Sequence, residues 1–190
     1  MSANFEIALI LKRKVLYSEV IEMIKEYFSE IVFEKVYVID NWEDEKYNNL
    51  TNILDVKITN LLDMGKIVIT YARVYEDVKA GFYLINQNGK FIVELWIDTD
   101  ICDELDSSHV DIHNEKIYNQ MVSCILDINS KYLIDICAMG SEIDFNYDKN
   151  IQECVVNSQN IVCWILFEEN NIVIPGYSRK MISQISVYWR

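Results

Sequence analysis

The spacing of hydrophobic positions in the first third of the chain switches between the strand period and the helix period. The short apolar run Phe5–Leu11 predicts a first strand. A 3.6-residue spacing follows and predicts a helix, with Ser18 as its N-cap. The apolar face of that helix consists of Val20, Ile21, Ile24, Tyr27, Phe28 and Ile31. Residues 33–39 are rich in β-branched and aromatic side chains and predict the next strand.

The middle of the chain predicts a second helix and then strands that follow one another. The helix is indicated by Leu50, Ile53, Leu54, Ile58, Leu61 and Leu62. Gly65 stands where a C-terminal cap belongs. Residues 66–75 resemble a strand, and residues 81–85 and 90–98 flank Asn88-Gly89, a pair that tolerates positive φ and predicts a hairpin.

Strand 91–98 shows two different faces. Phe91, Val93, Leu95 and Ile97 form a dry face, whereas Ile92, Glu94, Trp96 and Asp98 form a mixed face. One side of this strand therefore belongs to a core, and the other side combines apolar and charged groups.

The last third of the chain predicts one more helix and further strands. The helix has the apolar positions Ile117, Met121, Val122, Ile125 and Leu126. Residues 131–139, 161–167 and 172–174 predict strands, and residues 178–190 fit either a helix or a strand. We therefore expect an α+β fold over residues 1–190 as a single globular domain, with a mostly antiparallel sheet and three or more amphipathic helices packed on it.

Charge narrows the range of partners. The chain has 190 residues and a formal net charge of −13. Residues 41–115 carry fifteen acidic and six basic residues, while residues 1–40 and 116–190 each have a net charge of −2. This negative field opposes binding to nucleic acid or anionic lipid and attracts basic ligands. We expect neither nucleic acid nor a membrane as a partner.

The cysteines and the first residues indicate a cytoplasmic protein. Five cysteines occur without a C-x-x-C pair, and most have apolar neighbours, as is typical of reduced thiols in a core. Lys12-Arg13-Lys14 follows the first apolar run, which is the reverse of the order in a signal peptide. No apolar run approaches the roughly 20 residues that span a bilayer.

Residues 98–115 hold the densest group of acidic residues, together with both histidines, His109 and His113. Asp98-Thr99-Asp100 after an apolar strand resembles the metal-binding motif of nucleotide-sugar glycosyltransferases, whose carboxylates bind Mg²⁺ or Mn²⁺. The spacing does not fit an EF-hand, and no third ligand is fixed for the two histidines. The chain has no glycine-rich phosphate loop and no nucleophile elbow.

The same acidic stretch also fits a protein-binding face. Tryptophan beside carboxylates suits an interface in which the ring is buried and the acids meet Lys and Arg at the rim. The residues expected to bind the partner are Trp42, Glu43, Asp44, Glu45, Asp98, Asp100, Asp103, Glu104, Asp106 and Asp111. In this interpretation the protein binds no metal and no cofactor.

In general character the chain resembles the small acidic immunity proteins that bacteria make against toxins. The resemblance extends over the whole chain and includes its α+β pattern, its negative charge and its abundant Ile and Asn. It implies an inhibitor that occludes a basic partner such as a toxin nuclease, and it leaves a homo-oligomer open. The alternative is a divalent-metal-dependent transferase or hydrolase that uses Asp98 and Asp100.

Overall fold

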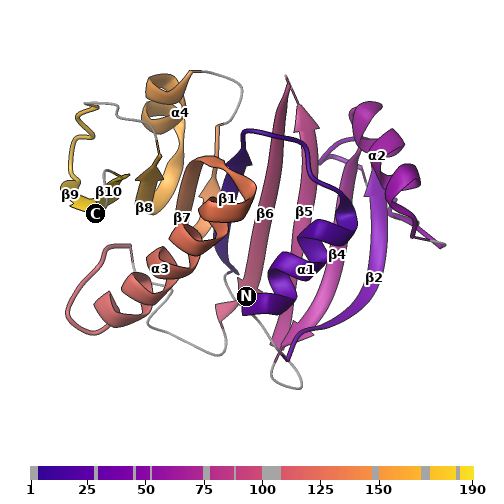
Figure 1. The fold of residues 1–190 in the computed structure, drawn as a ribbon, viewed down its shortest axis with the longest axis horizontal. Coiled ribbons are helices and arrows are strands. Elements are labelled where there is room, and N and C mark those ends of the chain that lie inside the picture. Colours follow the sequence, from indigo (N-terminus) through magenta and orange to yellow (C-terminus); the bar gives the residue numbers. More distant parts are fainter. Residues whose placement is uncertain are drawn as a thin grey trace.

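The structure is a computed structural model that places a large antiparallel sheet at the centre of the molecule (Figure 1). It describes residues 4–27, 30–44, 46–51, 53–74, 78–87, 89–99, 108–146, 150–167, 172–182 and 185–190. Within these residues the sheet has ten strands in the order β3-β2-β4-β5-β6-β1-β7-β8-β10-β9. The expected α+β class with an antiparallel sheet is confirmed.

The elements follow one another along the chain in this way. The strands are β1 (Asn4–Leu11), β2 (Val32–Ile39), β3 (Asn48–Asn49), β4 (Ile67–Val74), β5 (Val78–Gln87), β6 (Lys90–Asp98), β7 (Ile134–Asp144), β8 (Gln159–Leu166), β9 (Ser178–Ile182) and β10 (Ile185–Trp189). The helices are α1 (Tyr17–Tyr27), α2 (Asp55–Asp63), α3 (Glu115–Tyr132) and α4 (Ile151–Asn157).

The first strand lies in the middle of the sheet. β1 pairs antiparallel with β6 on one side and with β7 on the other. Phe5, Ile7 and Leu9 point to one side of the sheet, and Glu6, Ala8 and Ile10 point to the other, as the alternation of a strand requires. Glu6 therefore lies near the centre of the sheet.

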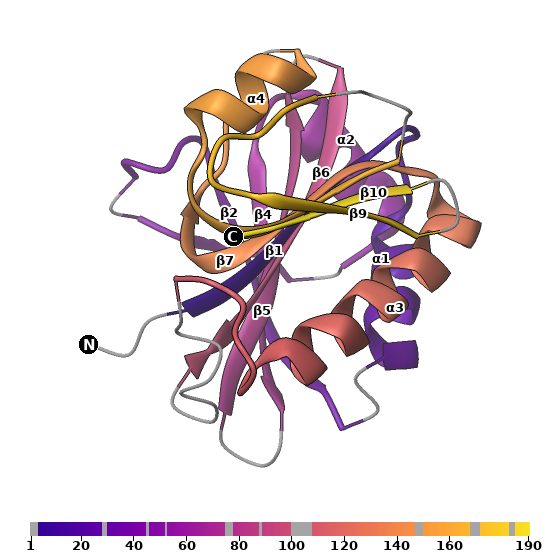
Figure 2. The ribbon, with the colours of Figure 1, turned by 90° about the vertical axis from the view of Figure 1, so that its left-hand side faces the viewer.

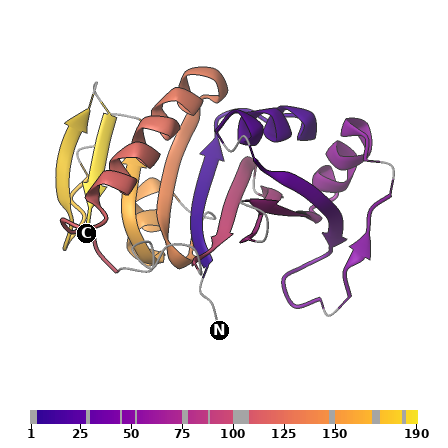
Figure 3. The same ribbon diagram turned by 90° about the horizontal axis from the view of Figure 1, so that it is seen from below.

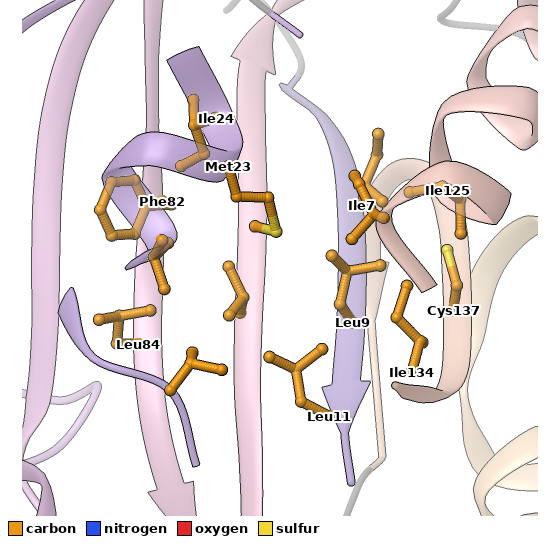
Figure 4. Packing of buried hydrophobic residues seen from close by; sticks show 14 of the residues in the cluster. Ile7, Leu9, Leu11, Met23, Ile24, Phe82, Leu84, Ile125, Ile134 and Cys137 are labelled. Carbon is orange, nitrogen blue, oxygen red and sulfur yellow. The ribbon is translucent and has the colours of Figure 1, made fainter. Parts of the chain in front are cut away.

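Helices α1, α2 and α3 cover one side, which we call the helix face (Figures 2 and 3). Its core contains Leu9 and Val93 from the central strands, Met23 from α1 and Ile125 from α3. Figure 4 shows Met23 of α1 and Ile125 of α3 beside the strand residues Ile7 and Leu9. Burial of these side chains supplies much of the stability of the fold, at about 1.5–3 kcal/mol for each large side chain.

The other side, which we call the opposite face, is only partly covered. Its apolar part holds Ile85 and Ile92 from the central strands and Trp164 from β8, and Cys154 and Val155 of α4 pack there. Figure 2 shows α4 on the side of the sheet away from α1 and α3. The remaining part of this face carries the candidate site described below.

Most predicted elements are confirmed, among them β1, α1, α3 and the β5–β6 hairpin with Gly89 at φ +76°. The N-cap assigned to Ser18 is wrong. Helix α1 begins one residue earlier, and the Glu19 carboxylate accepts a hydrogen bond from the Leu16 amide at 2.7 Å. Ser18 instead donates its hydroxyl to Asp55 of α2 at 2.7 Å.

Four further segments differ from the expectation. The second helix begins at Asp55 rather than near Leu50, whose amide donates to the Val36 carbonyl at 2.8 Å. Residues 172–174 form no strand, because Pro175 lacks an amide hydrogen and Gly176 turns the chain at φ +82°. Lys131 and Tyr132 complete α3 instead of opening a strand, and α4 was not expected.

Candidate functional site

Those predicted partner-binding residues that the structure describes do not lie together on one surface. Those within the described residues are Trp42, Glu43, Asp44, Asp98 and Asp111, while Glu45, Asp100, Asp103, Glu104 and Asp106 lie outside them. The indole of Trp42 packs against Tyr83 of β5, the fourth strand in the sheet order. Val110, next to Asp111, bonds to the carbonyl of Arg190 beside β10, the ninth strand. Trp42 and Asp111 are thus separated by five strand positions.

Two of the acidic side chains organise their own loops. Asp44 accepts hydrogen bonds from the amides of Asp40 and Asn41, at 2.6 and 3.1 Å. Asp111 accepts from the amides of His113 and Asn114, at 2.8 and 3.2 Å, just before α3 begins. These backbone hydrogen bonds hold the pKa of Asp111 below its usual value. Both carboxylates therefore have a local structural role.

A pair of glutamates that sequence reasoning did not select lies near the middle of the opposite face. Glu6 of β1 stands directly opposite Trp96 of β6, and Glu94 of β6 stands opposite Ala8 of β1. Glu6 and Glu94 point to the same face of the sheet and are offset by two positions on neighbouring strands, so they are diagonal neighbours. The sheet register, rather than any sequence motif, therefore brings these two carboxylates together.

The two carboxylates have few partners of opposite charge. Glu6 Oε2 accepts a hydrogen bond from the Ile143 amide at 2.7 Å. None of the salt bridges among the described residues involves Glu6 or Glu94. Both side chains are half-buried, so each has lost part of its hydration without gaining a cation.

This environment favours the protonated form of both groups. Burial raises the pKa of Glu6 to about 7, against the hydrogen bond from Ile143, and the charge of Glu142 adds to the rise. Burial raises the pKa of Glu94 to about 8, and the charge of Glu6 raises it further. Ionisation of Glu6 thus disfavours ionisation of its neighbour Glu94. Such displaced pKa values are typical of functional sites, although structural groups show them too.

A row of aromatic rings crosses the opposite face beside the glutamates. Tyr37 of β2 contacts Tyr71 of β4 with ring centroids 5.6 Å apart, and Tyr71 contacts Trp96 of β6 at the same distance. Tyr83 of β5 stacks on Trp96 at 6.4 Å, and Trp42 stands edge-on against Tyr83 at 5.0 Å. Trp42 is 52% exposed, so the row ends in a tryptophan that faces solvent.

Glycine makes the central ring possible. Gly81 of β5 lies opposite Trp96, and a Cβ atom at position 81 would stand 2.7 Å from the ring and 2.2 Å from the Thr70 carbonyl oxygen. The indole therefore lies over bare backbone. Trp96 is only 7% exposed, and its buried Nε1 has no hydrogen-bond partner among the described residues. A buried donor without an acceptor costs about 1–3 kcal/mol, so such a group requires an explanation, for example a catalytic role or a bound water or ion.

The sequence does contain a signal for this site. Glu6 is the one carboxylate of β1, and Glu94 lies in the middle of β6, where the residues between Lys90 and Asp98 are otherwise apolar. A charged residue inside a predicted strand, on a face that is otherwise buried, is uncommon and indicates either a specific partner or a functional role. The two positions are 88 residues apart, so only the pairing of β1 with β6 shows that they are neighbours.

Other kinds of site receive less support from the geometry. Among the described residues, no group of three or more His, Cys, Asp or Glu side chains has a metal-binding arrangement. Asp98 ends β6 on the same face as Glu94 and Trp96, whereas Asp100, the second residue of the predicted metal motif, lies outside the described residues. The four described cysteines are free thiols, and no described helix is long and apolar enough to cross a bilayer.

Comparison with known proteins adds no relative. No protein-family model, curated protein or solved structure matches this chain.

Proposed function

We propose that the protein is an acidic interaction module, of the immunity or inhibitor type, that binds a basic protein such as a toxin nuclease. In this proposal a lysine or arginine side chain of the partner enters the opposite face next to Glu6 and Glu94. One observation carries the proposal: two half-buried carboxylates stand together beside a row of aromatic rings, and no ion pair within the described part of the chain joins either of them to a cation.

The chemistry of the face suits a cationic side chain. Carboxylates at the base of the site would form charge-assisted hydrogen bonds with it, and ring faces attract a cation through their quadrupole. The net charge of −13 would draw a basic partner toward the molecule before contact. Exposed Trp42, one of the predicted partner-binding residues, would be buried at the edge of such an interface.

Binding of a cation at this place should release protons. A positive charge within about 4–6 Å favours the ionised form of a carboxyl group and lowers its pKa. Because the free protein holds Glu6 and Glu94 at pKa values of about 7 and 8, the pair is partly protonated at neutral pH. Affinity for a cation should therefore rise as the pH rises from 6 to 8.5.

The test uses a short peptide with one arginine between glycines, and a second peptide with citrulline in its place. NMR titration should show shifts of the Trp96 indole and the Ile143 amide with the arginine peptide alone. Glu94→Gln should weaken binding at pH 8 by about tenfold, as expected for the loss of one charge-assisted hydrogen bond. The matched control is Glu22→Gln, an exposed glutamate on α1 of the helix face, which should leave binding unchanged.

Two results would count against the proposal. Equal binding of the citrulline peptide would show that charge is not recognised, and equal loss in Glu22→Gln would show only a general effect of net charge. Binding that weakens as the pH rises would contradict the role of the carboxylate pair.

A second experiment concerns the encounter with a full-length basic partner. Exposed rim charges act mainly on the association rate. The Glu43 carboxylate accepts no hydrogen bond from the described residues of its loop, so its reversal should slow association several-fold at low salt and little at high salt. Reversal of Asp44 is a poor substitute, because this carboxylate also holds the amides of Asp40 and Asn41.

A further inference from the structure

A pocket at the β2 end of the opposite face, which we call the tyrosine pocket, is lined by Tyr37, Tyr47 and Tyr71 together with Glu34 and Lys35. Its volume is about 310 Å³, at the lower end of the range of about 300–1,000 Å³ that is usual for small-molecule sites. The Tyr37 ring lies 5.9 Å from Tyr47 and 5.6 Å from Tyr71, at interplanar angles of 74° and 89°. Tyr47 is 51% exposed, so part of this aromatic surface faces solvent.

An irregularity in β2 directs charged side chains toward this pocket. The register with β4 shifts between Phe33 and Lys35, so Glu34 is one extra residue in β2. A bulge of this kind bends the strand and changes the direction of its side chains. Lys35 stands opposite Tyr71 of β4, and its side chain therefore points to the opposite face beside the Tyr71 ring.

The charged residues beside the pocket are mainly basic, although the whole protein has a net charge of −13. Glu34 forms an ion pair with Arg73 of β4 at 2.5 Å, and Arg73 stands directly opposite Lys79 of β5. None of the ion pairs between described residues involves Lys35 or Lys79. Like charges that stand opposite each other destabilise a sheet. The described part of this corner thus brings three cations near one carboxylate, which suits an anionic ligand.

The carboxylate pair of the opposite face does not cancel this local charge. Glu94 lies on β6 and Glu6 on β1, two and three strands away from β4 (Figure 1). With about 4.8 Å between neighbouring strands, these distances are about 10 and 14 Å, whereas charges in water are largely screened beyond about 8 Å at physiological salt. An anion in the tyrosine pocket therefore meets mainly the basic residues around it.

We propose that the tyrosine pocket binds a small planar ring compound that carries a phosphate group, such as a nucleoside monophosphate. The ring would stack on Tyr47, as bases stack on exposed aromatic side chains. Lys35 and the phenol hydroxyl groups would donate hydrogen bonds to the phosphate oxygens. A long nucleic acid is opposed by the net charge of −13, whereas a single phosphate meets the local charge. The inference does not depend on the cation-binding role proposed for Glu6 and Glu94.

The probe is adenosine monophosphate, with adenosine and ribose phosphate as counterparts that lack the phosphate group and the ring. The monophosphate should bind the protein about tenfold more tightly than either counterpart, because each counterpart makes only part of the contacts. Its affinity should fall as salt rises, whereas the affinity for adenosine should change little. Isothermal titration calorimetry provides the measurement.

Two pairs of variants separate the contact with the ring from the contact with the phosphate. Tyr47→Ala should weaken binding about tenfold, and its matched control Tyr47→Phe, which keeps the ring, should remain within about twofold of the wild type. Lys35→Gln should weaken binding about fivefold and reduce its salt dependence, whereas Lys116→Gln on α3 should have no effect. Tyr47 and Lys35 are exposed, so these variants should keep the fold.

The position of the site is tested in the unmodified protein. The monophosphate should shift the NMR signals of the Lys35 and Tyr71 amides and leave the amide of Ile125 on α3 unchanged. Absence of saturable binding, equal binding of either counterpart, or unchanged signals of Lys35 and Tyr71 would each overturn the inference. A single-stranded oligonucleotide that binds more tightly than the monophosphate would contradict the choice of a small ligand.

Discussion

The two faces of the central sheet are built from the same strands and differ in what their side chains do. On the helix face, Phe82 and Val93 are fully buried among apolar neighbours from α1, α2 and α3. One residue further along the same strands, Tyr83 and Glu94 point to the opposite face and remain half-buried. Strand alternation thus separates a face that stabilises the fold from a face that keeps polar groups near solvent.

The difference between the faces shows that the fold tolerates partly buried carboxylates at a cost in stability. Apolar burial on the helix face stabilises the fold. On the opposite face, the partial burial of two carboxylates without an ion pair to a described residue reduces that stability. Functional sites commonly reduce stability in this way.

The largest effect is expected for Phe82→Ala. The Phe82 ring is fully buried and contacts the rings of Tyr17 and Phe33 at 5.8 and 6.1 Å. Its loss should lower the free energy of unfolding by about 3–5 kcal/mol, measured by urea denaturation. Tyr83→Ala, at the next position, should cost less than half as much and should weaken binding of the arginine peptide. If the two variants lowered the free energy of unfolding equally, the two faces would not differ in their contribution to stability.

A smaller loss is expected for Gly81→Ala. The added methyl group would meet the Trp96 ring and the Thr70 carbonyl oxygen, both well inside van der Waals contact. Overpacking of this kind typically costs about 1–3 kcal/mol. The fluorescence of Trp96 should also change, because its indole is displaced. A local adjustment of the backbone alone would leave the fluorescence unchanged. Full stability and an unchanged spectrum would show that the ring does not need bare backbone beneath it.

The carboxylate pair should make stability depend on pH. Its folded-state pKa values of about 7 and 8 lie above the ordinary value of 4.5. The folded protein therefore holds more protons than the unfolded chain between about pH 4.5 and 8, and the free energy of unfolding falls as the pH rises through that window. The stabilising contribution is complete below pH 4.5 and lost above pH 8.

Glu94→Gln isolates this effect. The neutral side chain should raise the free energy of unfolding at pH 8.5 on the order of 1–2 kcal/mol and change it little at pH 5. Thermal melts of both proteins from pH 5 to 8.5 provide the measurement, and a parallel pH dependence of the two proteins would contradict the assignment to Glu94. Other carboxylates contribute below this range, among them Glu19, whose pKa is lowered by its hydrogen bond with Arg13.

The smallest effect concerns the loop that carries Trp42. Asp44→Ala should cost about 0.5–1 kcal/mol, because the amides of Asp40 and Asn41 lose their acceptor to water. Glu43→Ala should be neutral within about 0.5 kcal/mol. A reversed order, measured by chemical denaturation, would contradict the structural role of Asp44.

The sequence predicts the helices and strands better than it predicts which residues lie side by side in the fold. The β5–β6 hairpin follows from Asn88-Gly89, and β1 and α3 follow from their periods. The seven-residue helix α4 was missed because it spans barely two turns, too few for a 3.6-residue period to stand out. The hairpin of β9 and β10 was ambiguous because residues 178–190 have neither a clean alternation nor a clean helical face.

The candidate site was largely missed for a physical reason. Trp42 belongs to the aromatic row, and its neighbour Glu43 remains a candidate for the partner-binding rim. Acidic density in the sequence drew attention to residues 98–115, where Asp111 serves the turn before α3. Glu6 and Glu94 become neighbours only through a strand register that joins residues far apart along the chain.

The central position of β1 has a consequence for the way in which the chain reaches its native state. The strand with the earliest residues needs β6 and β7, which end at Asp98 and Asp144. During synthesis it must wait for more than a hundred further residues before both of its edges are paired. Such distant pairing is entropically slow, so refolding should occupy milliseconds to seconds rather than microseconds. In that interval the exposed apolar strand needs protection from aggregation, by chaperones or by speed of translation.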